Sequence, residues 1–247
     1  MKGERLDERV VREGLAPSRS AARALILAGR VLVDDEPVDK AGTRIATDRI
    51  IRLKGGLRRF VSRGGEKLAG ALEDLGLDPS GRRCLDVGAS TGGFTDCLLQ
   101  AGAEFVVALD VGHGQIHSSL RLDPRVDVRE RVNARHIRPE QFEGDFDLVV
   151  ADVSFISLEL LLPAMQACAP AAELLLLVKP QFEVGRDQVG KGGVVRDDGL
   201  RKAAADRVVS SACALGRREL GRVNSRLAGP KGNREIFVWI SGSEVEE

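Results

Sequence analysis

The sequence predicts an α/β protein, in which a small N-terminal α+β unit precedes a doubly wound, mostly parallel sheet of seven strands. From residue 83 onward, short apolar runs alternate with amphipathic helical patterns, which is typical of a parallel sheet covered by helices. The first run leads into a glycine-rich turn and then a helix. Residues 1–63 carry 15 Lys+Arg against 9 Asp+Glu, a net charge of +6, and because the whole chain is neutral the remainder carries −6. This asymmetry predicts that the front of the chain contacts a polyanion.

The N-terminal unit is expected to contain two short helices followed by short strands. Leu6, Val10 and Val11 have helical spacing, and Gly14 ends that helix. Ser18 is a good N-cap for a second helix, which Gly29 ends. Alternating apolar residues then predict strands at 31–33, around 38 and at 49–53, before a linker at 54–57.

Several arginines of this unit lie on the second predicted helix and just after it. Charge alone would favour an ordinary solvated surface. However, residues 5–53 resemble the ribosomal-protein S-four-type RNA-binding domain, which implies that arginines hold RNA through its phosphates. With eight Phe, one Trp and no Tyr, stacking on single strands is poorly supplied, so structured RNA is the better partner. The predicted RNA-binding residues are Arg5, Arg19, Arg23, Arg30 and Arg63.

The glycine-rich turn lies between the apolar residues 84–87 and an amphipathic helix. Its spacing, Gly88-Ala-Ser-Thr-Gly92-Gly93, does not match the Gly-x-Gly-x-x-Gly pattern of dinucleotide sites. The acidic Asp86 before the turn and the hydroxyl groups inside it are similar to the first motif of S-adenosylmethionine (SAM) methyltransferases. A bare glycine turn could be purely structural, but its place in an alternating β/α pattern favours a SAM site.

A second acidic residue supports that interpretation. The strand 105–109 ends at Asp110, twenty-two positions after Gly88, where doubly wound folds place an acid that binds ribose hydroxyls. An aspartate that merely ends a strand is the alternative. The predicted cofactor-binding residues are Asp86, Gly88, Ala89, Ser90, Thr91, Gly92, Gly93, Asp110, Asn133 and Asp152.

The second unit is expected to continue as a β/α series after a helix that reaches Leu75. The late strand at 235–241 could form the antiparallel edge hairpin common to methyltransferase sheets. Helices are expected at about 92–101, 114–121, 157–169 and 197–214. Strands are expected at about 83–87, 105–110, 126–130, 146–151, 173–178, 217–224 and 235–241.

Two apolar strands end in charged residues that are candidates for catalysis. The strand at 146–151 ends at Asp152, and the strand at 174–178 ends at Lys179. Lysine is scarce in this chain, with eight Lys against 29 Arg, and it can lose its proton when desolvated, as arginine cannot. The structural alternatives are a lysine that reaches solvent and an aspartate that ends a strand.

Motifs throughout the chain make a family resemblance specific. The segments RFVSRGGEKL, LDVGASTGGFTDCLL, ALDVGHGQ, ADVSFISL, VKPQFEVGR, GGVVRD and GPKGNREIFVWI are similar, in order, to those of the TlyA family. That resemblance implies a Rossmann-like, FtsJ-like methyltransferase domain at 59–247, after an S-four-type domain and linker at 1–58. It also implies SAM-dependent methylation of cytidine 2′-hydroxyls in small- or large-subunit ribosomal RNA. The family's Lys-Asp-Lys-Glu tetrad falls on Lys67, Asp152, Lys179 and Glu235.

These residue types suit the chemistry, because a ribose hydroxyl is a poor nucleophile whose proton must leave. A lysine near the oxygen can stabilise developing negative charge or accept the proton. Lys179 is expected in that role, with Asp152 and Glu235 holding it and Lys67 positioning the ribose. His113 and His117 lack a third ligand, so no metal is expected.

Other classes of protein remain open at this stage. A ribosome-assembly factor without activity would not need an intact tetrad and glycine turn, and a small-molecule methyltransferase would not need the basic unit. A membrane-lytic protein, suggested because relatives are sometimes called haemolysins, disagrees with the charged N-terminus and with the charges and prolines that interrupt the most apolar tract. Scattered cysteines favour the cytoplasm. Ribosomal RNA or ribosomal subunits are the expected partners, and no membrane or protein partner is evident.

Overall fold

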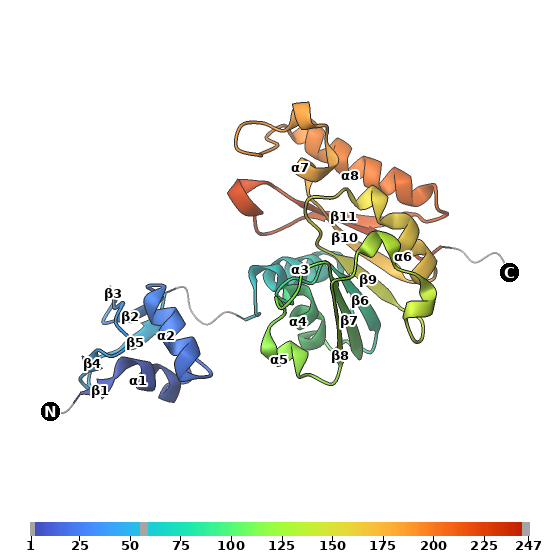
Figure 1. The fold of residues 1–247 in the computed structure, drawn as a ribbon. Helices are drawn as coiled ribbons and strands as arrows, with labels where there is room; N and C mark the ends of the chain where they lie inside the picture. Colours follow the sequence, from blue (N-terminus) through green and yellow to red (C-terminus); the bar gives the residue numbers. More distant parts are fainter. Residues whose placement is uncertain (1–2, 55–58, 244–247) are drawn as a thin grey trace. The chain divides into compact units, whose positions relative to one another are not determined.

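The computed structural model describes residues 3–54 and 59–243. The chain forms two compact units, residues 1–58 and 59–247, which are described separately below (Figure 1). Within the described residues, no helix is long and apolar enough to cross a membrane.

The N-terminal unit packs two helices against short strands. Ser18 is the N-cap of the second helix, as predicted, because its hydroxyl accepts a hydrogen bond from the Ala21 amide at 3.2 Å. The core of the N-terminal unit includes the fully buried Leu6, Val10 and Ile26. Strands β3, β2 and β5 form one antiparallel sheet and β1 pairs with β4. The elements are β1 (Glu4–Arg5), α1 (Leu6–Arg12), α2 (Arg19–Leu27), β2 (Val31–Val33), β3 (Glu36–Pro37), β4 (Arg44–Ile45) and β5 (Ile51–Leu53).

The second unit is built on a seven-stranded sheet in the order β11-β12-β10-β9-β6-β7-β8. The five adjacent strands β10, β9, β6, β7 and β8 are parallel, so their carboxyl ends lie at one edge of the sheet. Strand β12 is antiparallel to both β10 and β11. The strands are β6 (Arg83–Val87), β7 (Phe105–Asp110), β8 (Val126–Glu130), β9 (Leu148–Ala151), β10 (Glu173–Val178), β11 (Glu219–Asn224) and β12 (Ile236–Ile240).

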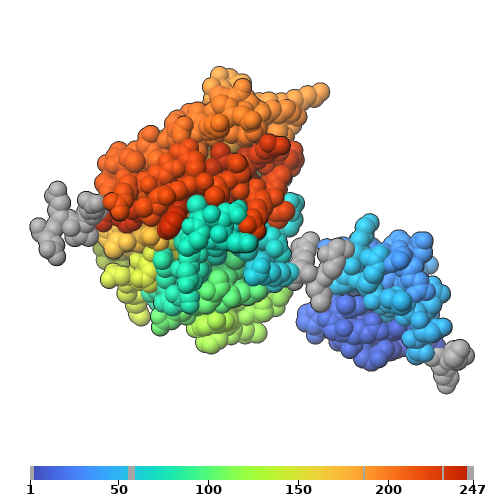
Figure 2. All heavy atoms as spheres, turned by 180° about the vertical axis from the view of Figure 1, so that it is seen from behind, coloured from blue at the N-terminus to red at the C-terminus, as the bar shows by residue number. Residues whose placement is uncertain are grey.

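Helices cover both faces of this sheet (Figure 1). The core on one face includes Leu68 of α3, Leu98 of α4 and Leu120 of α5, and the other includes Met165 of α6 and Val208 of α8. Figure 2 shows α8 in orange, the C-terminal strands in red and α3 in cyan on one side of the unit. The helices are α3 (Arg63–Leu75), α4 (Gly93–Gln100), α5 (Ser118–Arg121), α6 (Leu162–Cys168), α7 (Pro180–Glu183) and α8 (Asp198–Cys213). Short 3₁₀ turns accompany them, namely η1 (Ala134–His136), η2 (Pro139–Gln141), η3 (Leu158–Leu160), η4 (Arg186–Gln188) and η5 (Pro230–Gly232).

The predicted α/β sheet is confirmed, with differences at several boundaries. The helix expected at 114–121 begins only at Ser118, because Gly114 has a left-handed φ of +69° and His117 caps the helix. The helix expected at 157–169 divides into η3 and α6, and Pro163 lies in the first turn of α6. The late strand is antiparallel, as expected, but the outermost strand of the hairpin is β11 rather than β12.

Candidate active site

The glycine-rich loop between β6 and α4 lies against the end of β9. Gly88 has a φ of +86°, and a Cβ atom at this position would lie 2.7 Å from the Asp152 carbonyl oxygen. Glycine is therefore required both for the left-handed backbone and for the close approach of the two chain segments. Asp110 holds the loop from β7, because its carboxylate accepts a hydrogen bond from the Ser90 amide at 2.8 Å.

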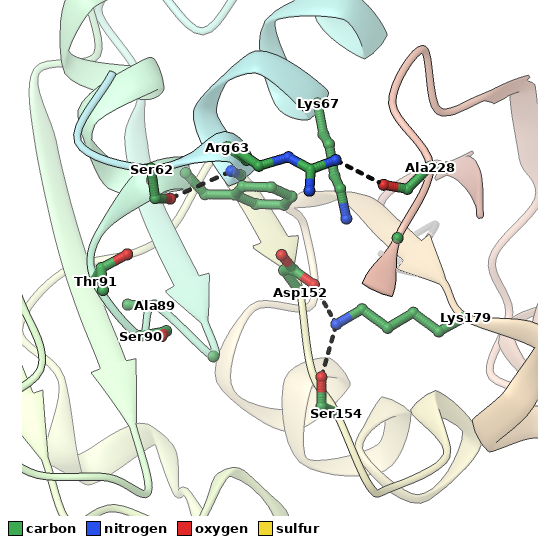
Figure 3. A pocket seen from close by; sticks show the side chains of 15 residues that line it. Ser62, Arg63, Lys67, Ala89, Ser90, Thr91, Asp152, Ser154, Lys179 and Ala228 are labelled. Carbon is green, nitrogen blue, oxygen red and sulfur yellow. Dashed lines mark hydrogen bonds and ion pairs between the residues drawn. The ribbon is translucent and has the colours of Figure 1, made fainter. Parts of the chain in front are cut away.

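Two adjoining cavities open at this edge of the sheet, and both are lined by Gly88, Ser90, Asp152 and Ser154. The first, drawn in Figure 3, has a volume of about 300 Å³ and contains the ends of two lysines, Lys67 and Lys179. The second has a volume of about 440 Å³ and walls rich in apolar side chains, among them those of Val111, Val132, Phe155 and Ile156.

Most of the predicted cofactor residues line these cavities. Ala89, Thr91 and Gly93 line the first cavity, and Asp110 and Asn133 line the second. Gly92 and Asp86 line neither. Gly92 is needed for packing instead, since a Cβ atom there would lie 2.2 Å from the Leu120 side chain.

Asp86 lies beneath the loop and is fully buried. Burial raises the pKa of the Asp86 carboxyl to about 7, although the Thr95 hydroxyl and amide donate hydrogen bonds to Oδ2 at 2.7 and 2.9 Å and favour the charged form. The other carboxylate oxygen, Oδ1, is buried and has no hydrogen-bond partner among the described residues. Through these bonds to Thr95, the Asp86 carboxyl group stabilises the first turn of α4.

The four residues of the predicted tetrad form two lysine–carboxylate pairs. Lys179 Nζ lies 2.6 Å from Asp152 Oδ1 and donates a hydrogen bond to Ser154 Oγ at 2.8 Å (Figure 3). Lys67 Nζ lies 2.5 Å from Glu235 Oε2. Both lysine side chains are less than a tenth exposed, so the cavity presents two nearly dry ammonium groups, each with its own carboxylate.

The pairing of Glu235 differs from the expectation that this carboxylate would hold Lys179. Glu235 precedes β12, which lies between β10 and β11, and its side chain is fully buried beside α3, which carries Lys67. The close approach of Gly229 encloses the same carboxylate, since a Cβ atom there would lie 2.0 Å from Glu235 Oε1. Glu235 therefore orients Lys67, and Asp152 with Ser154 orients Lys179.

The predicted RNA-binding arginines fall into two groups. In the N-terminal unit Arg5, Arg19 and Arg23 all donate to the carboxylate of Asp7, each at 3.0–3.1 Å, and Asp7 is fully buried. The hydrogen bond from Arg5 is the main reason that the pKa of Asp7 lies well below its usual range. Arg30 instead donates to the carbonyl of Lys54 at 3.0 Å.

Arg63 belongs to the second unit and lies at the wall of the first cavity. It donates a hydrogen bond to the Ala228 carbonyl at 3.0 Å, which joins the start of α3 to the loop before β12 (Figure 3).

Phe155, in the motif ADVSFISL, is a further candidate that the sequence pattern alone does not indicate. Its side chain is 91% exposed, its φ is +67°, and its ring lies 5.2 Å from that of Phe182. Glu183 holds the following segment by accepting hydrogen bonds from the Ser157 hydroxyl at 2.6 Å and the Leu158 amide at 3.0 Å. A left-handed, exposed aromatic residue beside a reactive cavity is unusual enough to indicate function, but its exposure cannot be read from hydrophobic periodicity.

The sheet with its antiparallel hairpin, the glycine loop and the lysine pairs define the class of the protein as a Rossmann-like methyltransferase. Comparisons agree: residues 60–241 match the FtsJ-like methyltransferase family, and residues 4–51 match the S4 domain. The chain is 52% identical over 238 residues to the 16S/23S rRNA (cytidine-2′-O)-methyltransferase TlyA of Mycobacterium tuberculosis, covering 96% of this chain and 89% of the relative.

Other relatives carry a different name. The chain is 43% identical to Hemolysin A of Brachyspira hyodysenteriae, covering 95% of this chain and 98% of the relative. A solved structure of a putative hemolysin from Streptococcus thermophilus superposes with a TM-score of 0.76 at 39% identity, covering 99% of this chain and 90% of that one. The chain belongs to the TlyA family of FtsJ-like methyltransferases.

Proposed function

We propose that the protein transfers a methyl group from SAM to a ribose 2′-hydroxyl of ribosomal RNA, with cytidine as the target nucleotide. The observation that carries this proposal is the pair of buried lysines, Lys67 and Lys179, facing one cavity beside the glycine loop. The printed activity of the 52% identical relative supports the choice of ribosomal RNA and cytidine.

The residues of the glycine loop and of the second cavity fit SAM. A Cβ at Gly88 would crowd the loop against Asp152, and the apolar wall of the second cavity suits an adenine ring. We expect Asp110, which lines this cavity, to accept hydrogen bonds from the ribose hydroxyls of SAM, as acids at this position of doubly wound folds do. When bound, SAM supplies an electrophilic methyl group on a sulfonium centre.

The lysine pairs are suited to activating a hydroxyl group. A ribose 2′-oxygen gains negative charge as its proton leaves, and ammonium groups already held in place stabilise that charge without reorganisation. Asp152 Oδ1 and Ser154 Oγ lie 2.6 and 2.8 Å from Lys179 Nζ and fix its position. In our proposal, this ammonium group contacts the reacting oxygen. Lys67, held by Glu235 at 2.5 Å, positions the ribose and adds a second positive charge.

The arginines around Asp7 are suited to binding RNA phosphates. Three guanidinium groups share the carboxylates of Asp7 and Glu8, so the cluster keeps a net positive charge. Arg19 and Arg23 are about half exposed, and phosphates can reach them from solvent. Such contacts position RNA without reading its sequence. Arg30 and Arg63 extend the same role, the second at the cavity itself.

Phe155 supplies what a methyltransferase acting on a single nucleotide requires beside its reaction centre. Bases that are recognised individually are unstacked and packed against aromatic rings. The ring of Phe155 is exposed, lies 5.2 Å from that of Phe182 and also lines a separate cavity that contains Lys179, so we assign it the target base.

Ribose methylation can be mapped by mass spectrometry on ribosomal RNA that has been incubated with the purified protein and SAM. We expect one or a few new 2′-O-methylcytidines that are absent when SAM is omitted. Methylation of bases only, or no methylation of either free RNA or ribosomal subunits, would contradict the proposed function.

A further inference from the structure

Two loops beside the catalytic cavity are held together by one buried side chain. Asn233 is 2% exposed, its Nδ2 donates to the Gly193 carbonyl at 2.8 Å, and its Oδ1 accepts from the Val195 amide at 3.0 Å. These bonds join the loop at 190–196 to the loop at 229–235, which lie next to each other in Figure 1. The donor and the acceptor of the Asn233 amide are therefore both used to align the two loops.

Four basic residues lie on these loops and near the start of α8, namely Arg196, Lys202, Lys231 and Arg234. All four side chains are exposed, and each lines a hollow in the surface. None of these four side chains forms an ion pair or hydrogen bond with another part of the described chain. Arginines elsewhere in this unit, such as Arg125 and Arg222, pair with nearby carboxylates at 2.5–3.0 Å.

Acidic residues near these four cations are already engaged. Asp198 is the carboxylate that lines the same hollows, and it forms an ion pair with Arg201. Asp197 caps α8 by accepting a hydrogen bond from the Leu200 amide at 2.8 Å. The four cations therefore leave a local excess of positive charge on a unit that is acidic as a whole.

The hollows connect these cations with the reaction centre. One cavity of about 360 Å³ is lined by Lys179, Phe155 and Lys231. The next, of about 400 Å³, is lined by Lys231, Arg196 and Arg234, and a third, of about 420 Å³, by Arg234 and Lys202. Successive cavities share Lys231 and then Arg234, and we call this row of hollows, from Lys179 to Lys202, the basic groove.

We propose that this basic groove binds phosphates of the RNA strand that carries the target ribose. This inference rests on the proposed function, because a strand whose 2′-hydroxyl reaches Lys179 must continue past the cavity in both directions. Exposed, unpaired guanidinium and ammonium groups are what a phosphodiester chain requires, and each contact releases counterions from the RNA. The groove would hold the strand near the reacting nucleotide, in addition to the arginines around Asp7.

The test compares two variants of the full chain with equal net charge. The first is Arg196→Gln with Arg234→Gln, and the matched control is Arg125→Gln with Arg222→Gln, whose arginines lie outside the groove. Affinity for a protein-free ribosomal RNA fragment is measured between about 50 and 200 mM salt. We expect the groove variant to bind about tenfold more weakly at low salt, with a salt slope shallower by about 1.5, whereas the control keeps the wild-type slope.

Equal salt slopes for the groove variant and the control on protein-free RNA would overturn the inference. If the two variants then differed only in binding assembled subunits, the occupant of the groove would be a ribosomal protein. SAM affinity serves as the folding control and should match wild type in both variants. Methylation by the wild-type protein is measured in parallel. If wild type methylates and the slopes are equal, the groove fails alone; if wild type does not methylate, the proposed function fails and the slopes still report on the groove.

Discussion

The two units of the chain arrange positive charge in opposite ways. Around Asp7, one fully buried carboxylate holds three arginines whose side chains are 35–53% exposed. In the candidate active site, two lysines are less than a tenth exposed and each has its own carboxylate. The first arrangement leaves cations available to a large polyanion in solvent, whereas the second fixes charges inside a small, nearly dry cavity.

This difference has a consequence for the effect of salt. Exposed charges are screened by ions within about 8 Å at physiological ionic strength, whereas buried pairs are screened much less. RNA binding by the arginine cluster should therefore weaken steeply with salt. The turnover of bound substrate, which depends on the lysine pairs, should change little over the same range.

Replacing Gly88 by alanine should have the largest effect on SAM binding. The new Cβ would lie 2.7 Å from the Asp152 carbonyl oxygen, which forces the loop and the end of β9 apart. We expect SAM affinity to fall by about 100-fold, as for a misplacement of about 1 Å in a binding site. Isothermal titration calorimetry measures this loss.

Gly81→Ala is the matched control, because Gly81 has a φ of +68° and a Cβ atom there meets nothing within 4 Å. Both substitutions introduce similar backbone strain, but only the first one crowds the loop. Equal SAM affinities for the two folded variants would show that the glycine loop is not the binding site.

Reversing Arg19 and Arg23 to glutamate should have an intermediate effect, confined to RNA. The two substitutions remove phosphate contacts and place unpaired acids next to the buried Asp7. We expect RNA affinity to fall by at least about tenfold and the salt slope to become shallower by about 1.5. SAM affinity should not change.

The control for this pair is Arg12→Glu with Arg52→Glu, which gives the same net charge. Arg12 pairs with Glu4 and Arg52 with Asp35, away from the Asp7 cluster. If the control weakens RNA binding as strongly, the N-terminal unit acts through its total charge and not through the cluster.

Asp86→Asn should have the smallest effect, a change in how stability depends on pH. In the folded protein the pKa of Asp86 is raised from 3.8 to about 7, so the folded state holds its proton more tightly than the unfolded chain. The resulting stability is complete below pH 4 and is lost as pH rises to about 7. The wild-type melting temperature should therefore fall by several degrees more than that of Asp86→Asn between pH 4 and 7. Parallel pH profiles would place the titration elsewhere.

The sequence was sufficient for the fold because several central strands, such as 105–109, 148–151 and 174–178, are uninterrupted apolar runs. All seven strands of the large sheet occur near their predicted positions. Boundaries failed where a local cap decided them, as at Gly114 and His117, since periodicity does not report where a left-handed residue interrupts a helix. The short helix α7, which begins directly after Lys179, has too few residues to show any periodicity.

The candidate site was predictable in its residues more than in its pairings. Strand ends and motifs indicated Asp152 and Lys179, which the structure places 2.6 Å apart. The partner of Lys67 could not be found in this way, because Glu235 is 168 positions distant and reaches it only through the insertion of β12 between β10 and β11. A role for Phe155 was not predictable, because the exposure of an aromatic residue in a loop leaves no pattern in the sequence.

In our account, lysines held by carboxylates carry out the chemistry, whereas arginines and other basic residues outside the lysine pairs supply most of the affinity for RNA. This division of roles is tested most directly by single-turnover methylation of ribosomal RNA by Lys179→Ala, with saturating SAM and RNA and with both affinities measured. We expect the rate to fall by about 100- to 1,000-fold or more while both ligands bind as in wild type. Lys179→Arg separates the roles, because it keeps the charge but cannot accept a proton. A wild-type rate for Lys179→Ala would contradict the claim.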